Sequence, residues 1–193
     1  MLEFNAENHE YKIDGIRAPS VTQIIPAPEH LQFIRNLEEK RLQGTERHEK
    51  IKMFFDLGGY EEPQEWDDTE LQTFSDLIHD NKFLLGDLIV YEKPMYSVKY
   101  HFCGTPDAVF ENALVDFKSS MVNKTHSALQ FAGYSIMIEE LGILKTKNWL
   151  VIFQNRDKWK IQKVYHPRAK KMFLELRKKY EIEQNYKKYM EGK

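Results

Sequence analysis

The stretch Pro106-Asp107-Ala108-Val109-Phe110-Glu111-Asn112-Ala113-Leu114-Val115-Asp116-Phe117-Lys118 decides the fold of this chain. It contains two apolar segments, residues 106–110 and 113–118, joined by a short polar turn at Glu111-Asn112. Two such segments around a turn are typical of a β-hairpin. Eight residues separate Asp107 from Asp116, so we expect both carboxylates near the open end of the hairpin.

Side chains along the return strand alternate between the two faces of the sheet. Asp116 and Lys118 therefore project to one face and Phe117 projects to the other, toward the core. Two neighbouring carboxylates repel unless a cation joins them or one takes a proton. Lys118 supplies part of that compensation, and a divalent metal such as Mg²⁺ supplies more. The alternative reading is an ordinary hairpin with a surface Asp–Lys pair.

The composition predicts one globular domain over residues 1–193. The chain is 41% apolar and 13% aromatic, and a chain of this length needs no disulfide or structural metal to fold. Cys103 is the only cysteine, which excludes an intrachain disulfide and any site built from several thiolates. Met1–Asn5 lacks the pattern of a signal peptide, and no apolar run reaches membrane-spanning length. We therefore expect a soluble cytoplasmic protein without a membrane partner.

The net charge of −2 conceals a strong asymmetry along the chain. Residues 1–144 hold 13 Lys/Arg and 25 Asp/Glu, whereas residues 145–193 hold 15 Lys/Arg and 5 Asp/Glu. Such a split indicates that one face meets a polyanion, or that the two halves attract each other. A solvated basic helix over residues 167–190 is the plain alternative.

The first part of the chain, residues 1–82, predicts a hairpin followed by helices. The expected elements are strands at 2–5 and 10–13 with a turn at Asp14-Gly15, a short helix capped by Ser20 and ending at Ile25, a long helix over 31–57 with a break near Gly44, and a helix capped by Asp68 or Thr69.

The remainder predicts a run of strands, a helix, a hairpin and a terminal helix. The expected elements are strands at 84–92, 96–102, 109–110 and 114–117, a helix capped by Thr125 and stopped by Gly142, strands at 149–154 and 160–165 around a turn at 155–157, and the basic helix. This order favours an α/β fold with a central mixed β-sheet flanked by helices.

Three motifs in this order resemble the PD-(D/E)XK nuclease superfamily. They are Gly104-Thr105-Pro106-Asp107, then Asp116-Phe117-Lys118, then Gln130-x-x-x-Tyr134. The last is typical of the RecB-like exonuclease branch, and the chain is similar to its phage-type members without an iron–sulfur cluster. Two upstream elements also look like that branch, the run Gly44-Thr45-Glu46-Arg47-His48 and the opening from Tyr11 to Thr22.

The resemblance implies a restriction-endonuclease-like core and a role for each matching residue. Asp107 and Asp116 would bind Mg²⁺ or Mn²⁺, with the backbone carbonyl of Phe117 and the side chain of His48 as further ligands. Lys118 would orient or help deprotonate the attacking water and offset charge on the phosphate. On the sequence alone, a lone helical histidine such as His48 is more often a surface or core residue.

Several other residues are candidate contacts for a substrate. Gln130 and Tyr134 lie four apart on a helix and so share a face, although Tyr134 could simply pack in the core. Lys124, with Thr125, begins this helix and could bind phosphate through charge and free amides. The remaining candidates are Ser20 and Thr22, which could touch a DNA phosphate or serve only in helix capping, and Glu92 as a weaker additional acid.

These observations predict a metal-dependent deoxyribonuclease, an exonuclease acting on single- or double-stranded DNA ends in recombination, repair or phage DNA processing. The alternatives are an endonuclease on the same core and a catalytically silent nucleic-acid-binding module. The resemblance places the protein in the cytoplasm of a bacterial or phage-infected host cell. It leaves open a homo-oligomer and a recombination protein partner.

Overall fold

A five-stranded sheet forms the centre of the protein. The computed structural model describes residues 1–5, 10–27, 37–118, 123–155 and 158–192. The strands lie in the order β10-β9-β8-β7-β4, with bounds of Lys158–Lys163, Trp149–Asn155, Leu114–Lys118, Ala108–Phe110 and Leu88–Tyr91. β8 and β9 run parallel, and the other neighbouring pairs run antiparallel. The sheet is therefore mixed, as the sequence predicts.

The expected hairpin is present as β7 and β8. Ala108 pairs with Val115 and Val109 pairs with Leu114. The turn closes with a 2.8 Å hydrogen bond from the Phe110 N–H to the Ala113 carbonyl. Apolar side chains on both faces explain the position of β8 inside the sheet, because a strand covered on both sides reads as a continuous apolar run.

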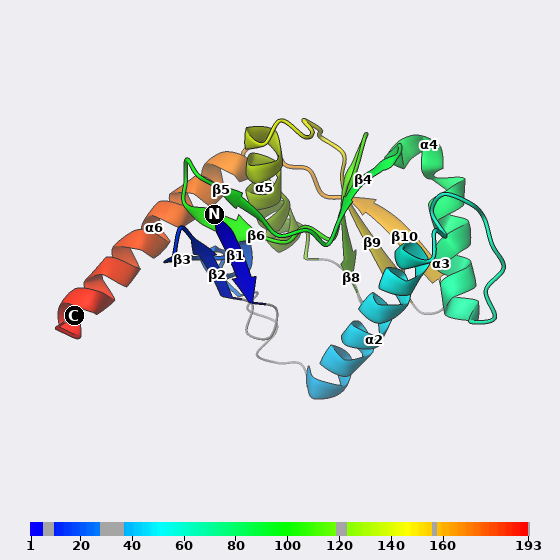
Figure 1. The fold of residues 1–193 in the computed structure, drawn as a ribbon, viewed down its shortest axis with the longest axis horizontal. Helices are drawn as coiled ribbons and strands as arrows, with labels where there is room; N and C mark the ends of the chain where they lie inside the picture. Colours follow the sequence, from blue (N-terminus) through cyan, green and yellow to red (C-terminus); the bar gives the residue numbers. More distant parts are fainter. Residues whose placement is uncertain (6–9, 28–36, 119–122, 156–157, 193) are drawn as a thin grey trace.

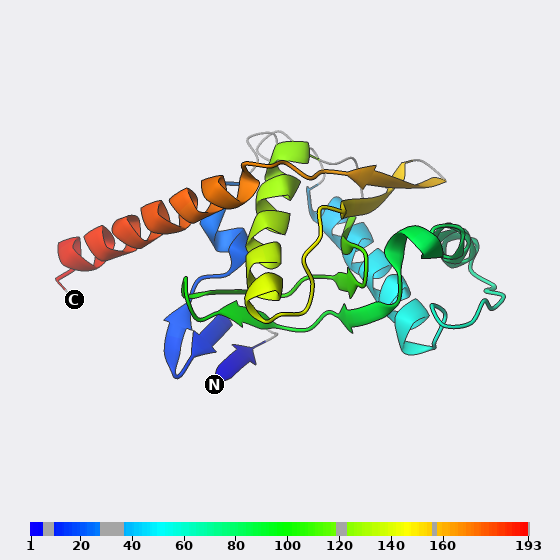
Figure 2. The same ribbon diagram turned by 90° about the horizontal axis from the view of Figure 1, so that it is seen from above.

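Helices cover both faces of the sheet (Figures 1 and 2). α5 (Lys124–Glu140) packs with Leu114, Val151 and Phe153 on one face. α2 (Leu37–Asp56), α3 (Thr69–Asp80) and α4 (Lys82–Leu85) pack on the other, over Val115 and Phe117. The alternation of side chains along β8 thus sends Asp116 to the α5 face and Phe117 to the α2–α3 face.

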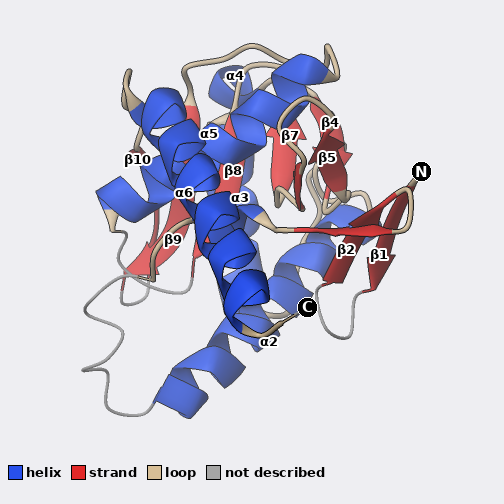
Figure 3. Ribbon diagram, turned by 90° about the vertical axis from the view of Figure 1, so that its left-hand side faces the viewer, coloured by secondary structure: helices blue, strands red, loops and turns tan. Residues whose placement is uncertain are grey.

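Two smaller sheets and two further helices complete the fold (Figures 1 and 3). The Cys103 N–H donates to the Pro19 carbonyl at 2.9 Å, which ties the second small sheet to the start of α1. α6 contacts α5 and α1, and its C-terminal half projects from the body (Figure 1). The elements are β1 (Leu2–Asn5), β2 (Glu10–Ile13) and β3 (Ile16–Ala18) in one sheet, β5 (Met95–Ser97) and β6 (Phe102–Gly104) in the other, and the helices α1 (Val21–Ile24) and α6 (Ala169–Met190).

Most of the expected helix starts are correct, and one is wrong. Ser20 caps α1 through a capping box with Gln23, and the Asp68 side chain caps α3. The cap of α5 is Asn123, whose side chain accepts the His126 N–H, rather than Thr125. Asn is a better N-cap than Thr, and here it lies just before the first helical residue.

Two strand predictions and one helix prediction need correction. The expected strand at 84–92 begins as helix α4 and becomes β4 only after Gly86, whose φ of +74° turns the chain. The expected strand at 96–102 is split by a turn in which Ser97 Oγ accepts the Tyr100 N–H at 3.0 Å. α2 is continuous through Gly44, although glycine has a low helix propensity.

Some predictions fall outside the described residues, and one strand was not predicted. Residues 31–36 of the expected long helix and residues 156–157 of the expected turn are not described. β3 pairs with β2 directly after the turn at Asp14-Gly15, so the opening hairpin is a three-stranded sheet. Within the described residues, no helix is long and apolar enough to cross a membrane.

A substitution at Gly133 tests the packing of α5 against α1 and α6. A Cβ at Gly133 would lie 2.8 Å from Val21 Cγ2 and 2.9 Å from the Phe173 ring. Gly133→Val should therefore lower the free energy of unfolding by about 2–3 kcal/mol, measured by urea denaturation. A variant as stable as the parent protein would contradict this close packing.

Candidate active site

A cleft of about 620 Å³ opens where β7 begins. Its walls come from the N-terminal sheet, α1, α2, the end of β4, the β6–β7 connection and α5, and they are lined by Phe4, Tyr11, Ser20, Val21, Thr22, His48, Glu92, Gly104, Thr105, Asp107 and Tyr134. Residues far apart in the sequence therefore meet around Asp107, which keeps part of its surface exposed to this cleft.

The Asp107 carboxylate binds the backbone of the facing strand. Its Oδ2 accepts the Phe117 N–H at 2.7 Å. That amide follows directly from Asp116, so the bond holds the two aspartates beside each other. The N–H and C=O of one residue in a strand point to the same side, so the Phe117 carbonyl also points toward Asp107.

Asp116 is almost completely buried, with 1% of its surface exposed, and it is held by two side chains. Lys118 Nζ lies 3.1 Å from Asp116 Oδ1 and 2.9 Å from Oδ2. Gln130 Nε2 donates to Oδ1 at 3.2 Å. These contacts supply the compensation that a buried carboxylate needs. They also show that Asp116 and Lys118 share one face, as predicted.

Gln130 links Asp116 to the aromatic wall of the cleft. Its Nε2 also lies within hydrogen-bond distance, 3.1 Å, of the Tyr134 hydroxyl, and its Oε1 accepts from Lys118 Nζ at 3.3 Å. Tyr134 passes close to Gly104, where a Cβ would lie 2.8 Å from Tyr134 Cε1. The first residue of the Gly104-Thr105-Pro106-Asp107 motif is therefore glycine because the tyrosine ring occupies the space.

The electrostatics of the pair favour protonation of Asp107. Burial raises the pKa of Asp107 to about 7, and the neighbouring Asp116 adds to the shift. Burial opposes the charge on Lys118, but Asp116 and Asp107 outweigh it and raise the pKa of Lys118. Lys118 therefore remains a cation, which suits it to orient water and offset negative charge.

His48 reaches the same cleft from α2 and faces Glu92. Its Nδ1 lies 4.0 Å from Glu92 Oε1. Glu92 raises the pKa of His48 most, burial opposes this, and Asp107 and Asp116 add to the rise. Glu92 itself has a φ of +41°, a conformation that side chains other than glycine rarely adopt and that is common at functional sites.

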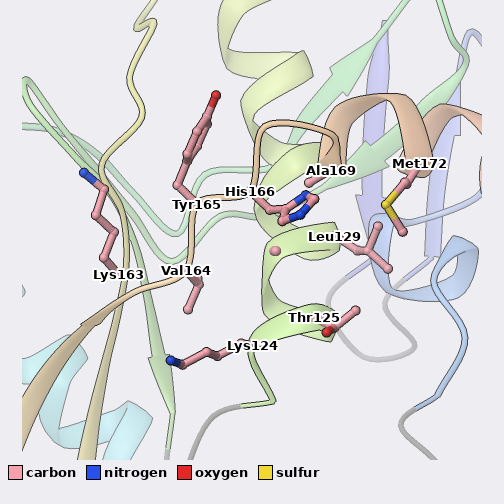
Figure 4. A pocket seen from close by; sticks show the side chains of 10 residues that line it. Lys124, Thr125, Leu129, Lys163, Val164, Tyr165, His166, Ala169 and Met172 are labelled. Atoms are coloured by element: carbon pink, nitrogen blue, oxygen red, sulfur yellow. The ribbon is translucent and has the colours of Figure 1, made fainter.

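The remaining predicted contacts divide between two places. Ser20 and Thr22 line the cleft, with their hydroxyl oxygens 3.0 Å apart, and Ser20 Oγ also accepts the Gln23 N–H at 3.2 Å. Lys124 and Thr125 instead line a separate hollow at the start of α5 (Figure 4). Any contact of Lys124 with a substrate is therefore made outside the Asp107 cleft.

Five residues that line the cleft were not predicted as site residues, namely Phe4, Tyr11, Val21, Gly104 and Thr105. Phe4 and Tyr11 stack with ring centroids 4.7 Å apart, and the Tyr11 hydroxyl lies 2.8 Å from Thr105 Oγ1. Tyr11 and Thr105 belong to motifs that the sequence already shows. Their common position depends on how the N-terminal sheet docks, for which local sequence patterns give no signal.

The donor set suits a hard divalent cation. Asp107 accepts the Phe117 N–H at Oδ2, so its Oδ1 can face a cation, and within the described residues Asp116 Oδ2 receives no hydrogen bond of normal geometry. Carboxylate and carbonyl oxygens are the ligands that Mg²⁺ and Mn²⁺ prefer. Among the described residues, however, no three His, Cys, Asp or Glu side chains are close enough together to form a ready metal site.

Comparisons with known proteins do not identify a family. No family model matches the chain, and no curated protein matches it in sequence. The resemblance to PD-(D/E)XK nucleases therefore rests on the sequence motifs alone.

The raised pKa of Asp107 predicts how stability changes with pH. The folded-state pKa lies above the ordinary value of 3.8, so protonation favours the folded state and stability falls as pH rises through about 7. In EDTA at pH 8, Asp107→Asn should therefore be more stable than the parent protein by about 2 kcal/mol. The gain should shrink toward pH 5 in thermal melts.

The exposed loop residue Asp67 provides a control for this measurement. Asp67→Asn should show no comparable gain at pH 8, because its carboxylate is already in water. A gain at Asp107 that is the same at pH 5 and pH 8 would show that the effect is not one of charge.

Proposed function

We propose that this protein is a metal-dependent deoxyribonuclease with a restriction-endonuclease-like core, acting as an exonuclease on DNA ends. The observation that carries the proposal is the convergence of two carboxylates and one ammonium group. The Asp107 carboxylate binds the amide next to Asp116, and Lys118 Nζ lies 2.9 Å from Asp116 Oδ2. Such a set fits the PD-(D/E)XK motif, and the sequence resemblance rests on these same residues together with Gln130 and Tyr134.

The chain's own groups would divide the work of phosphodiester hydrolysis. Asp107, Asp116, the Phe117 carbonyl and His48 would hold Mg²⁺ or Mn²⁺, which lowers the pKa of bound water and polarises the phosphoryl group. Lys118 would position the attacking water and offset the negative charge that develops on the phosphate. Gln130 would keep Asp116 and Lys118 aligned, while Ser20 and Thr22 face the substrate across the cleft.

A digestion experiment tests this proposal. With Mg²⁺ or Mn²⁺, the protein should degrade end-labelled linear DNA, and EDTA should abolish the reaction. Lys118→Ala should bind DNA normally but cleave it at least 100-fold more slowly, because it loses a charge near the reacting phosphate. Asp116→Asn, which keeps the shape of the side chain, should be inactive.

A closed circular substrate distinguishes an exonuclease from an endonuclease, and a matched variant provides the control. A covalently closed circle should remain intact with an exonuclease and should be cut by an endonuclease. Asp67→Asn, purified in parallel, should keep full activity, which shows that an Asp→Asn change does not by itself inactivate the protein, and the inactive Asp116→Asn preparation controls for contaminating nucleases. Full activity of Asp116→Asn would refute the mechanism.

Gln130 provides a test of positioning. Gln130→Leu removes the amide that bonds Asp116 and the Tyr134 hydroxyl, so we expect kcat to fall about 10- to 100-fold. Tyr134→Phe removes only the hydroxyl and should retain most of the activity. The Mn²⁺ concentration for half-maximal rate should rise in Gln130→Leu, a change that loss of packing alone would not cause.

A second candidate is a catalytically silent nucleic-acid-binding module of the same fold. The observation that favours it is the lack, among the described side chains, of a gathered three-ligand group. Calorimetric titration with MnCl₂ separates the two candidates. A nuclease should show binding heat that disappears in Asp107→Asn/Asp116→Asn, whereas a silent module should show none.

A further inference from the structure

Two hollows adjoin each other along the connection between β10 and α6. The first, of about 360 Å³, lies at the start of α5 (Figure 4), and the second has about 530 Å³. Both are lined by Tyr165 and His166 of the connection. We call the two together the basic groove, because they share these walls and because of the charges that line them.

The basic groove concentrates positive charge from several segments. Its lining includes one carboxylate, Glu139, which is already paired with Lys170 at 2.6 Å. Lys163 donates to the neutral Asn148 side chain at 2.8 Å and so keeps its charge uncompensated by that contact. The lining lysines are Lys124, Lys145, Lys147, Lys163 and Lys170.

Apolar and aromatic side chains also line the groove. Leu129 and Met172 line the first hollow (Figure 4), and Tyr165 lines both hollows. The Tyr165 ring is half-buried and packs edge-on against Trp149, with centroids 4.9 Å apart. Lysines close to an aromatic ring are the combination that binds single-stranded nucleic acids, with phosphates on the lysines and bases stacked on the ring.

The groove and the cleft lie on opposite faces of one helix. Gln130 and Tyr134 of α5 face Asp116, whereas Lys124 and Leu129 of the same helix line the groove. A helix is about 10 Å across, a distance that a strand spans in about three nucleotides at roughly 3.4 Å each.

We propose that the basic groove binds a single strand of DNA, with its phosphates on the lysines and a base against Tyr165. The proposal rests on the proposed function only in taking DNA as the substrate. A duplex would present only its phosphates to the groove, because its bases are paired and stacked, and Leu129, Tyr165 and Met172 would have no base to contact. The described lining of the cleft includes Glu92 and Asp107 but no lysine, so the electrostatic attraction for a polyanion comes from the groove.

Binding without cleavage tests the groove independently of the active site. Anisotropy of a fluorescein-labelled oligothymidylate would be measured in EDTA between 50 and 200 mM NaCl. Lys145→Glu/Lys147→Glu should raise Kd at least 10-fold at 50 mM salt. The slope of log K against log salt should become shallower by about 1.4, the value for two lost contacts to single-stranded DNA.

The chain offers a matched control on the projecting end of α6. Lys187→Glu/Lys188→Glu makes the same change in net charge at two exposed residues outside the groove, and Kd should stay within twofold of the parent value. Lys145→Gln/Lys147→Gln repeats the test without charge reversal. Tyr165→Leu should weaken binding several-fold while leaving the salt slope unchanged, because stacking releases no counterions.

The outcomes distinguish this proposal from the proposed function. If the parent protein does not bind the oligonucleotide at 50 mM salt, or if groove and control variants lose affinity equally, the groove is not the binding site. If Asp116→Asn cleaves normally while the groove variants lose binding, the proposed active site fails and the groove stands. Circular dichroism and thermal melts show that each variant is folded.

Discussion

The hydrogen bond from the Phe117 N–H to Asp107 Oδ2 organises the centre of this protein. The backbone pairing of β7 with β8 ends at Ala108 and Val115. Beyond this pair, the Asp107 side chain accepts the hydrogen bond from the Phe117 N–H in place of a backbone carbonyl. This bond aligns the start of one strand with the end of the next. It also forces two carboxylates together, so the charge of Lys118 becomes a structural requirement.

The surrounding residues can be understood as responses to that concentration of charge. A carboxylate as buried as Asp116 costs several kcal/mol unless it is paired and hydrogen-bonded. Lys118 and Gln130 provide those contacts, and Gln130 is in turn held near the Tyr134 hydroxyl. Tyr134 fits only because position 104 has no side chain. The motif residues are thus connected by contact, from the strands to α5.

The sequence could predict those parts that depend on short-range periodicity. The alternation in residues 114–118 predicted that Asp116 and Lys118 share one face and Phe117 the other, and the spacing of Gln130 and Tyr134 predicted their common face. Local patterns failed where the chain changes direction for tertiary reasons. Position 86 accepts only glycine, because its φ is +74° and a Cβ there would lie 2.8 Å from Glu111 Cβ, a contact that neighbouring residues do not reveal. The Asn123 cap is a local contact with the His126 N–H, and the sequence analysis missed it.

The least predictable feature is the basic groove, because its lysines come from segments separated by up to 46 positions in the chain. The sequence shows an excess of basic residues after position 144 and suggests the long terminal helix as its location. The structure gathers several of them along the β10–α6 connection instead, while Lys179 of α6 lies 3.8 Å from Glu183.

The lysines of the basic groove and the carboxylates of the cleft lie on different faces of α5, and this separation has a physical consequence. Among the described residues, the lining of the cleft includes Glu92 and Asp107 and no lysine or arginine, so it offers a polyanion little attraction. Electrostatic attraction in physiological salt persists over about 8 Å, close to the width of the single helix between groove and cleft. Under the proposed binding mode, lysines on the far face of α5 would hold a strand near the cleft without pairing with Asp107 or Glu92, whose oxygens would stay available for a metal. The same lysines inside the cleft would pair with those carboxylates instead.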